Sequence, residues 1–134
     1  MRYLRSTDAA APLARYSPGV EIGAGERLVL CSGQLATSAS GQVPASVFEQ
    51  TTQCLENAEA VLKSAGLDRR AVVKLTAYVT DRSHLGDYMA ARDAFFRNRQ
   101  EPPASTLLIV SGFSRPEFLV EVEVMAAADF RETV

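Results

Sequence analysis

An alternating run near the C-terminus, residues 119–126, constrains the fold of this chain more than any other segment. Its valines and Ala126 alternate with two glutamates and a methionine, which is the period of a β-strand with two unlike faces. The valine face predicts a strand that covers a core. The other face carries Glu121 and Glu123 beside apolar residues, which is unusual for a face that only meets solvent, so we take Glu121 as the leading candidate for a functional site.

Shorter stretches predict further strands. Gly33 is expected to end the third of them, because glycine weakens a strand interior. The last two are expected to pair with each other as a hairpin across residues 111–118. The expected strands are residues 1–5, 20–22, 27–32, 72–80, 105–110 and 119–127.

Two helices are expected between these strands. Ser46 and Glu49 have capping-box spacing ahead of an apolar stripe that ends at Gly66, a residue suited to a left-handed cap. A second helix follows residue 80, with Asp81 or Ser83 as its cap. One face of that helix comprises Leu85, Tyr88, Met89, Arg92, Phe95 and Phe96, of which only Arg92 is charged.

This order of elements predicts an α+β fold, a two-layer sandwich in which two helices cover one face of a mixed sheet. The length of 134 residues predicts a single domain over residues 1–134. The sheet face without helices carries carboxylates beside apolar groups. Self-association of the chain through that face is therefore expected.

The composition and charge of the chain argue against several classes of function. The net charge of −2 supplies no electrostatic footprint for nucleic acid or an anionic membrane. No run of apolar residues predicts a membrane span or a signal peptide. Cys31 and Cys54 have no metal or redox spacing, and His84 is the single histidine, so a multi-histidine metal site within one chain is excluded. We expect a cytoplasmic protein with reduced thiols.

Several short motifs, in one order and at one spacing, resemble the Rid family, also called RidA, YjgF or L-PSP. The resemblance covers nearly the whole chain, and it implies a chorismate-mutase-like fold. It also implies a homotrimer with three pockets between neighbouring subunits. The motifs lie at residues 15–20, at Ser-Gly-Gln 32–34, at Gln50-Thr51 with Asn57, at 72–81, at Pro-Ala-Ser-Thr 103–106 and at 119–123.

The resemblance also implies an activity. Deaminating members of the family hydrolyse reactive enamines and imines, such as 2-aminoacrylate, to 2-oxo acids and ammonia, without a metal or an organic cofactor. A carboxylate in the last strand, here Glu121, positions or activates the attacking water. Tyr16, Ser32 and Gly33 match the positions that complete the site. Such chemistry is reasonable, because an imine carbon is already electrophilic and the water needs only placement and loss of a proton.

The chain departs from the family at the position that holds the substrate carboxylate. Ser105, or Ala104 in an alternative alignment, stands where the family motif has an arginine, and neither residue is a cation. Met89 stands where deaminating members often have asparagine. A hydroxyl cannot make the paired charged hydrogen bonds of a guanidinium, so the substrate is expected to lack the usual carboxylate. Ser105 and Thr106 stay predicted pocket residues. Arg15, beside Tyr16, is a candidate for the missing cation.

Alternatives stay open at this point. The pockets could hold a metabolite without turnover, which would make the protein a non-catalytic binding trimer. Glu121 and Glu123 could instead pair with an arginine of the neighbouring subunit as structural ion pairs. An endoribonuclease, the activity in the L-PSP label, ranks last, because the chain is acidic and has no tryptophan to stack on bases.

Overall fold

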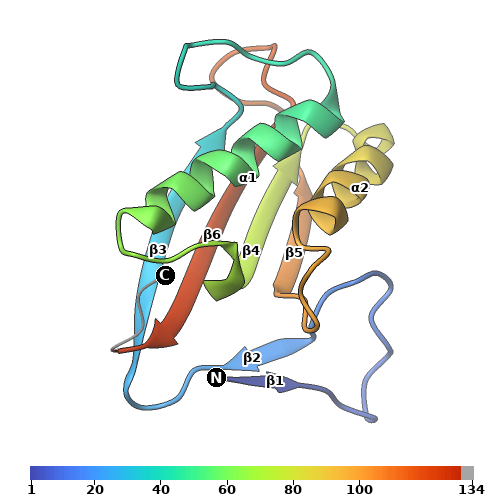
Figure 1. Cartoon of the computed structure of the whole chain (residues 1–134). Helices are drawn as coiled ribbons and strands as arrows, with labels where there is room; N and C mark the ends of the chain where they lie inside the picture. The colour runs from blue at the N-terminus through green and yellow to red at the C-terminus, as the bar shows by residue number, and fades with distance from the viewer. Residues whose placement is uncertain (131–134) are drawn as a thin grey trace.

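A computed structural model of the chain describes residues 1–130, so residues 131–134 of the predicted domain lie outside the described residues. Two helices lie on one face of a four-stranded mixed sheet, and a two-stranded ribbon lies below that sheet (Figure 1). The predicted α+β class is confirmed. The elements are β1 (Arg2–Leu4), β2 (Gly19–Glu21), β3 (Glu26–Leu35), α1 (Val47–Lys63), η1 (Arg69–Ala71), β4 (Val72–Val79), η2 (Arg82–His84), α2 (Leu85–Phe95), β5 (Ala104–Ile109) and β6 (Val120–Asp129).

The strand order in the larger sheet is β3-β6-β4-β5. Strand β6 is antiparallel to both of its neighbours, whereas β5 is parallel to β4. The predicted hairpin between residues 105–110 and 119–127 is therefore wrong, because β4 separates these two strands. The reason is that α2 joins β4 to β5 as a crossover, and a crossover connection places the two strands side by side in parallel.

The valine face of β6 forms the centre of the core, as predicted. Val120, Val122 and Val124 are at most 3% exposed, and they pack with Leu75 and the buried side chains of α1. Full burial of one such aliphatic side chain contributes about 1.5–3 kcal/mol to folding. Because these positions face the helices, the alternating glutamates of β6 must face the opposite side of the sheet.

The helix boundaries follow the predicted caps in part. Ser46 Oγ accepts a hydrogen bond from the Glu49 amide at 3.1 Å, and Gly66 has φ of 74°, so both ends of the α1 segment are confirmed. Asp81 caps the short η2 turn by accepting from the Ser83 amide at 2.8 Å. Helix α2 then begins after His84 without a side-chain cap of its own.

Strand β3 does not end at Gly33 but runs to residue 35, which corrects the predicted boundary. The register between β3 and β6 shifts between Cys31 and Gln34, so Ser32 and Gly33 lie in a β-bulge. A bulge accommodates one extra residue and lets the strand continue. The glycine therefore marks a local irregularity beside β6 and not the end of the strand.

Two polar residues of α1 hold neighbouring loops by hydrogen bonds. The Gln50 side-chain amide donates to the carbonyl oxygens of Pro44 at 2.9 Å and Glu117 at 2.8 Å. Asn57 donates to the Leu35 carbonyl oxygen at 3.0 Å, at the end of β3. Both residues belong to the motifs noted in the sequence, and their role here is to fix the loops at one end of the sheet.

Candidate active site

The face of the sheet away from the helices carries the two glutamates of β6. Tyr78 of β4 lies opposite Glu121 in the register, and its hydroxyl donates a hydrogen bond to the Glu123 carboxylate. The pKa of Tyr78 is raised, chiefly by this hydrogen bond and to a lesser extent by burial. Glu123 thus has a phenol partner within its own chain. Among residues 1–130, no hydrogen bond or ion pair engages the Glu121 carboxylate.

The Glu121 carboxyl group lies directly against the bulge of β3. A Cβ atom built at Gly33 would stand 2.8 Å from Glu121 Cδ and 2.9 Å from Oε1. Any side chain at position 33 would therefore displace the carboxylate. The structure brings together three of the predicted site positions here, because Ser32 lies in the same bulge as Gly33.

Thr106 also belongs to this open face, since it pairs with Thr76, which in turn pairs with Glu123. The Thr106 hydroxyl accepts a hydrogen bond from Lys74 Nζ at 2.6 Å. Lys74 and Tyr78 were not predicted as site residues. The signal that could have found them is the alternation in residues 72–80, which places both on the same face as Thr76.

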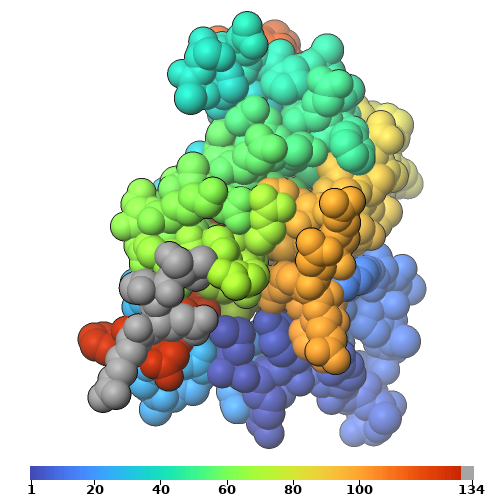
Figure 2. Space-filling model, viewed as in Figure 1, coloured from blue at the N-terminus to red at the C-terminus, as the bar shows by residue number. Residues whose placement is uncertain are grey.

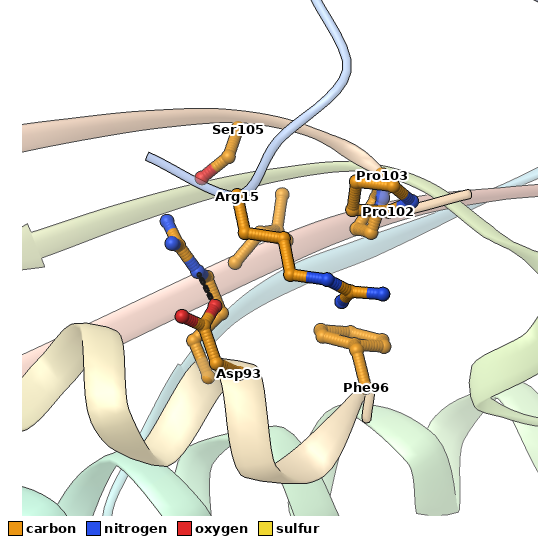
Figure 3. A pocket seen from close by; sticks show the side chains of 8 residues that line it. Arg15, Asp93, Phe96, Pro102, Pro103 and Ser105 are labelled. Carbon is orange, nitrogen blue, oxygen red and sulfur yellow. Dashed lines mark hydrogen bonds and ion pairs between the residues drawn. The ribbon is translucent and has the colours of Figure 1, made fainter. Parts of the chain in front are cut away.

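Ser105 lies on the other face of the sheet. It pairs with the fully buried Leu75, and it lines a narrow crevice between β5 and α2 together with Arg15, Arg92 and Asp93 (Figure 3). Within one chain, Ser105 and Glu121 therefore face opposite sides of the sheet. A pocket that contains both residues requires more than one copy of the chain.

Tyr16 lines a different hollow, of about 390 Å³, with the N-terminal segment and Pro102. Ser17 fixes this region, because its amide donates to the Pro103 carbonyl oxygen at 3.1 Å and its hydroxyl donates to that of Pro102. Arg15 and Tyr16 directly precede this anchor, and they line separate hollows that share Pro102. Sequence reasoning missed Ser17, whose signal was the Ser-Pro turn.

The loop after α2 lies against the N-terminal segment on the molecular surface, as Figure 2 shows in orange and dark blue. Two contacts join them, since Arg99 donates to the Tyr3 hydroxyl at 2.7 Å and Arg5 forms an ion pair with Glu101 at 2.5 Å. These contacts help fix the wall of the Tyr16 hollow. Met89, also predicted as a pocket residue, lies partly buried against the hydrophobic core.

The described part of the chain offers no set of side chains that could bind a metal ion. Residues 1–130 contain no group of three or more His, Cys, Asp or Glu side chains placed to hold a metal ion. Both cysteines are buried and outside any disulfide, and burial raises the pKa of Cys54 to about 12. None of the helices over the same residues has the length and apolarity to cross a membrane.

Comparisons with known proteins agree on one family. A sequence model of the family described as Endoribonuclease L-PSP matches residues 6–128. A RutC family protein of Haemophilus influenzae is 32% identical over 126 residues, which are 92% of this chain and 94% of that protein. The 2-iminobutanoate/2-iminopropanoate deaminase of Escherichia coli K12 is 30% identical over 125 residues, with 92% and 94% covered.

A solved structure shows the same architecture. The crystal structure of YyfB from Yersinia pestis, a protein of unknown function in the conserved Rid family, has a TM-score of 0.83 and 28% identity. The alignment covers 95% of this chain and 98% of that one. Because the family model spans most of the sequence and these relatives share its length, the chain belongs to the Endoribonuclease L-PSP family, the family of the Rid (YjgF) proteins.

Proposed function

We propose that this protein hydrolyses a reactive imine or enamine metabolite, and that Glu121 positions the attacking water. One observation carries the proposal most directly: the Glu121 carboxylate lies against the Gly33 backbone without a hydrogen-bond or ion-pair partner in residues 1–130. A carboxylate in that state is available to accept a proton from water. The relative named as a 2-iminobutanoate/2-iminopropanoate deaminase supports the reaction class.

The proposed site lies between subunits of a homotrimer. Large apolar side chains on the open sheet face are half exposed in the single chain, which is typical of a surface that a partner covers. A second copy of the chain against this face would shield them and enclose Glu121. The side chains are Leu28 at 52%, Leu30 at 65%, Leu108 at 48% and Met125 at 44% exposed.

The proposed substrate differs from a simple 2-imino acid. Ser105 offers a hydroxyl where the related deaminases are expected to have a guanidinium, so a neutral or hydroxylated substrate group suits this position better than a carboxylate. In the same chain, Ser105 faces the opposite side of the sheet from Glu121, and Tyr16 lines a separate hollow. The proposal therefore assigns them to the pocket of a neighbouring subunit.

Separate assays with two kinds of imine test the substrate assignment. An amino-acid oxidase generates 2-iminopropionate in situ, and an amine oxidase generates an imine without a carboxylate; semicarbazide traps whichever imine remains. We expect the protein to accelerate loss of the second imine, and Ser105→Arg to extend the activity to 2-iminopropionate. Ser114→Arg, at an exposed loop serine, is the matched control and should behave like the unchanged protein.

The contradicting result is equally specific. If neither imine disappears faster with the protein or with Ser105→Arg, hydrolysis is not its function, and a non-catalytic metabolite-binding trimer becomes the better description. If 2-iminopropionate is hydrolysed rapidly by the unchanged protein, the site accepts a carboxylate despite Ser105, and the proposed substrate class is wrong.

A further inference from the structure

The two glutamates on the open face of β6 have the same chemistry but different surroundings. Glu121 and Glu123 lie two residues apart on one face of the strand, a separation of roughly 7 Å along it. The Tyr78 hydroxyl donates a hydrogen bond to the Glu123 carboxylate, whereas no hydrogen bond or ion pair within residues 1–130 engages Glu121. Of these two possible proton acceptors, one is therefore held by a donor and the other is not.

The Tyr78 side chain lies beside both carboxylates. Tyr78 pairs with Glu121 in the register of β4 and β6, yet its hydroxyl reaches Glu123, which pairs with Thr76. The side chain thus begins opposite one glutamate and ends at the other. Because β6 lies between β3 and β4 (Figure 1), Glu121 has the Gly33 backbone on one side and Tyr78 on the other.

The other titratable groups of the neighbouring elements do not replace this contact. Lys74, on the same face of β4, donates to the Thr106 hydroxyl at 2.6 Å. Strand β5 contains no charged residue, and the charged residues of β3 are its first two, which pair with residues 128 and 129 at the far end of β6. Cys31 of β3 and Cys54 of α1 stay neutral, because burial raises the pKa of both thiols. Among the described residues, Tyr78 is therefore the polar partner of Glu123.

The proposed hydrolysis needs one ionised carboxylate at the start of each cycle. The oxygen of water bonds to the imine carbon while a proton of that water passes to Glu121. The carbon–nitrogen bond then breaks, both protons of the water end on the nitrogen that leaves as ammonia, and the oxygen remains as the carbonyl. Any group that keeps Glu121 protonated between cycles would therefore slow the reaction.

We propose that Tyr78 is a positioning residue, which holds Glu123 by its hydrogen bond so that Glu121 is the glutamate of this pair that takes the proton from water. This inference rests on the proposed function. Without the phenol, two unpaired like charges would stand on one face of β6 within a subunit contact. Such a pair holds one proton in common more readily than either carboxylate does by itself, so Glu121 would be protonated for part of the time.

The pH dependence of imine hydrolysis tests the proposal. Tyr78→Phe keeps the ring and removes the hydroxyl. We expect the pH of half-maximal hydrolysis to rise by about one unit in this variant, with the rate at higher pH unchanged. Addition of Glu123→Gln should restore the original profile, because the second charge is then absent. Tyr78→Phe with Glu56→Gln, which removes an exposed carboxylate of α1 instead, is the matched control and should keep the shifted profile.

The ultraviolet absorbance of tyrosinate supplies a measurement without turnover. The difference between each protein and its Tyr78→Phe counterpart isolates this phenol among the four tyrosines. Glu123→Gln should move the titration of Tyr78 to lower pH by more than Glu121→Gln does, because the hydrogen bond to Glu123 is the main cause of its raised pKa. A larger shift in Glu121→Gln would mean that the phenol binds Glu121 in solution, and it overturns the proposal.

The two measurements separate this inference from the proposed function. If the unchanged protein hydrolyses imines and Tyr78→Phe has the same pH profile, the role of Tyr78 is refuted while the hydrolase proposal stands. A shifted profile that Glu56→Gln corrects as well as Glu123→Gln also refutes it. If the unchanged protein hydrolyses no imine, the proposed function fails, and the catalytic role of Tyr78 fails with it, even where the absorbance shows that the phenol holds Glu123.

Discussion

The backbone of Gly33 lies against the carboxyl group of Glu121, so closely that a Cβ atom at position 33 would stand 2.8 Å from Glu121 Cδ. The two residues come from neighbouring strands, and the β-bulge of β3 brings them into contact. The absence of a side chain at position 33 therefore sets where the carboxylate can lie.

Gly33→Ala should separate the position of the carboxylate from the stability of the fold. The new methyl group meets the end of a flexible side chain, so the free energy of unfolding should change by less than about 1 kcal/mol. A displaced carboxylate should lower the rate of imine hydrolysis about 100-fold. Urea denaturation and the semicarbazide assay measure the two effects.

Gly86→Ala is the matched control for that substitution. A Cβ at Gly86 meets nothing within 4 Å, and the residue lies in α2. This variant should gain up to about 1 kcal/mol of stability and keep full activity, because alanine favours a helix over glycine. Unchanged hydrolysis in Gly33→Ala would show that the position of Glu121 is irrelevant to turnover.

The hydrogen bond between Tyr78 and Glu123 should make the stability of the protein depend on pH in the alkaline range, and Tyr78→Phe should remove that dependence. It raises the pKa of Tyr78 in the folded chain, so its contribution is complete below the unfolded tyrosine pKa of about 10 and is lost as the pH rises through the folded value. As the pH rises above about 10, the unchanged protein should lose stability more steeply than Tyr78→Phe. Parallel stability curves of the two proteins would contradict this assignment.

The ion pair of Glu59 and Arg69 should make the stability of the protein depend on pH in the acid range. Arg69 donates to both carboxylate oxygens of Glu59, at 2.7 and 2.8 Å, and these hydrogen bonds lower the pKa of Glu59. The stabilisation is therefore present above the unfolded pKa of 4.5 and is lost as the pH falls through the lower folded value. Because Arg69 is 40% exposed, we expect only about 1–2 kcal/mol at neutral pH.

Glu59→Gln tests this pair by chemical denaturation at several pH values. The variant should be less stable than the unchanged protein at neutral pH, and the difference should shrink as the pH falls below 4.5. A difference that stays constant with pH would mean that the charge on Glu59 contributes nothing to the stability.

The open sheet face should control assembly. Leu30 is 65% exposed in the single chain and lies opposite Met125 in the register. Leu30→Asp should convert a trimer into monomers, because a carboxylate buried in the subunit contact would be costly. Leu13→Asp, at a residue 97% exposed in the N-terminal loop, should leave the assembly unchanged. If light scattering shows that the unchanged protein is a monomer, the proposed site between subunits is refuted.

Local patterns predicted those parts of the fold that depend on local interactions. The Ser46 cap, the end of α1 at Gly66 and the valine face of β6 were all readable from spacing, because caps and periodicity act over a few residues. The pairing of β5 was not predictable in this way. It depends on the crossover through α2, and adjacency along the chain favoured the wrong partner.

The same limit applies to the site. The sequence indicated Glu121 as a site residue. It did not reveal that Ser105 faces the opposite side of the sheet, because the side that a residue faces depends on the strand register. Arg92 did give a local signal, as the single charge in an apolar helical stripe. What that charge contacts could be learned only from the packing of α2 on β5.

Turnover by Glu121→Gln, measured as semicarbazide-trapped imine against time, tests the central claim most directly. The amide keeps the size of the side chain but cannot take a proton from water, so hydrolysis should fall about 100-fold or more while light scattering shows an unchanged assembly. Glu123→Gln, two residues along the same face, should retain most of the activity. Full activity in Glu121→Gln, with the assembly intact, would contradict the account.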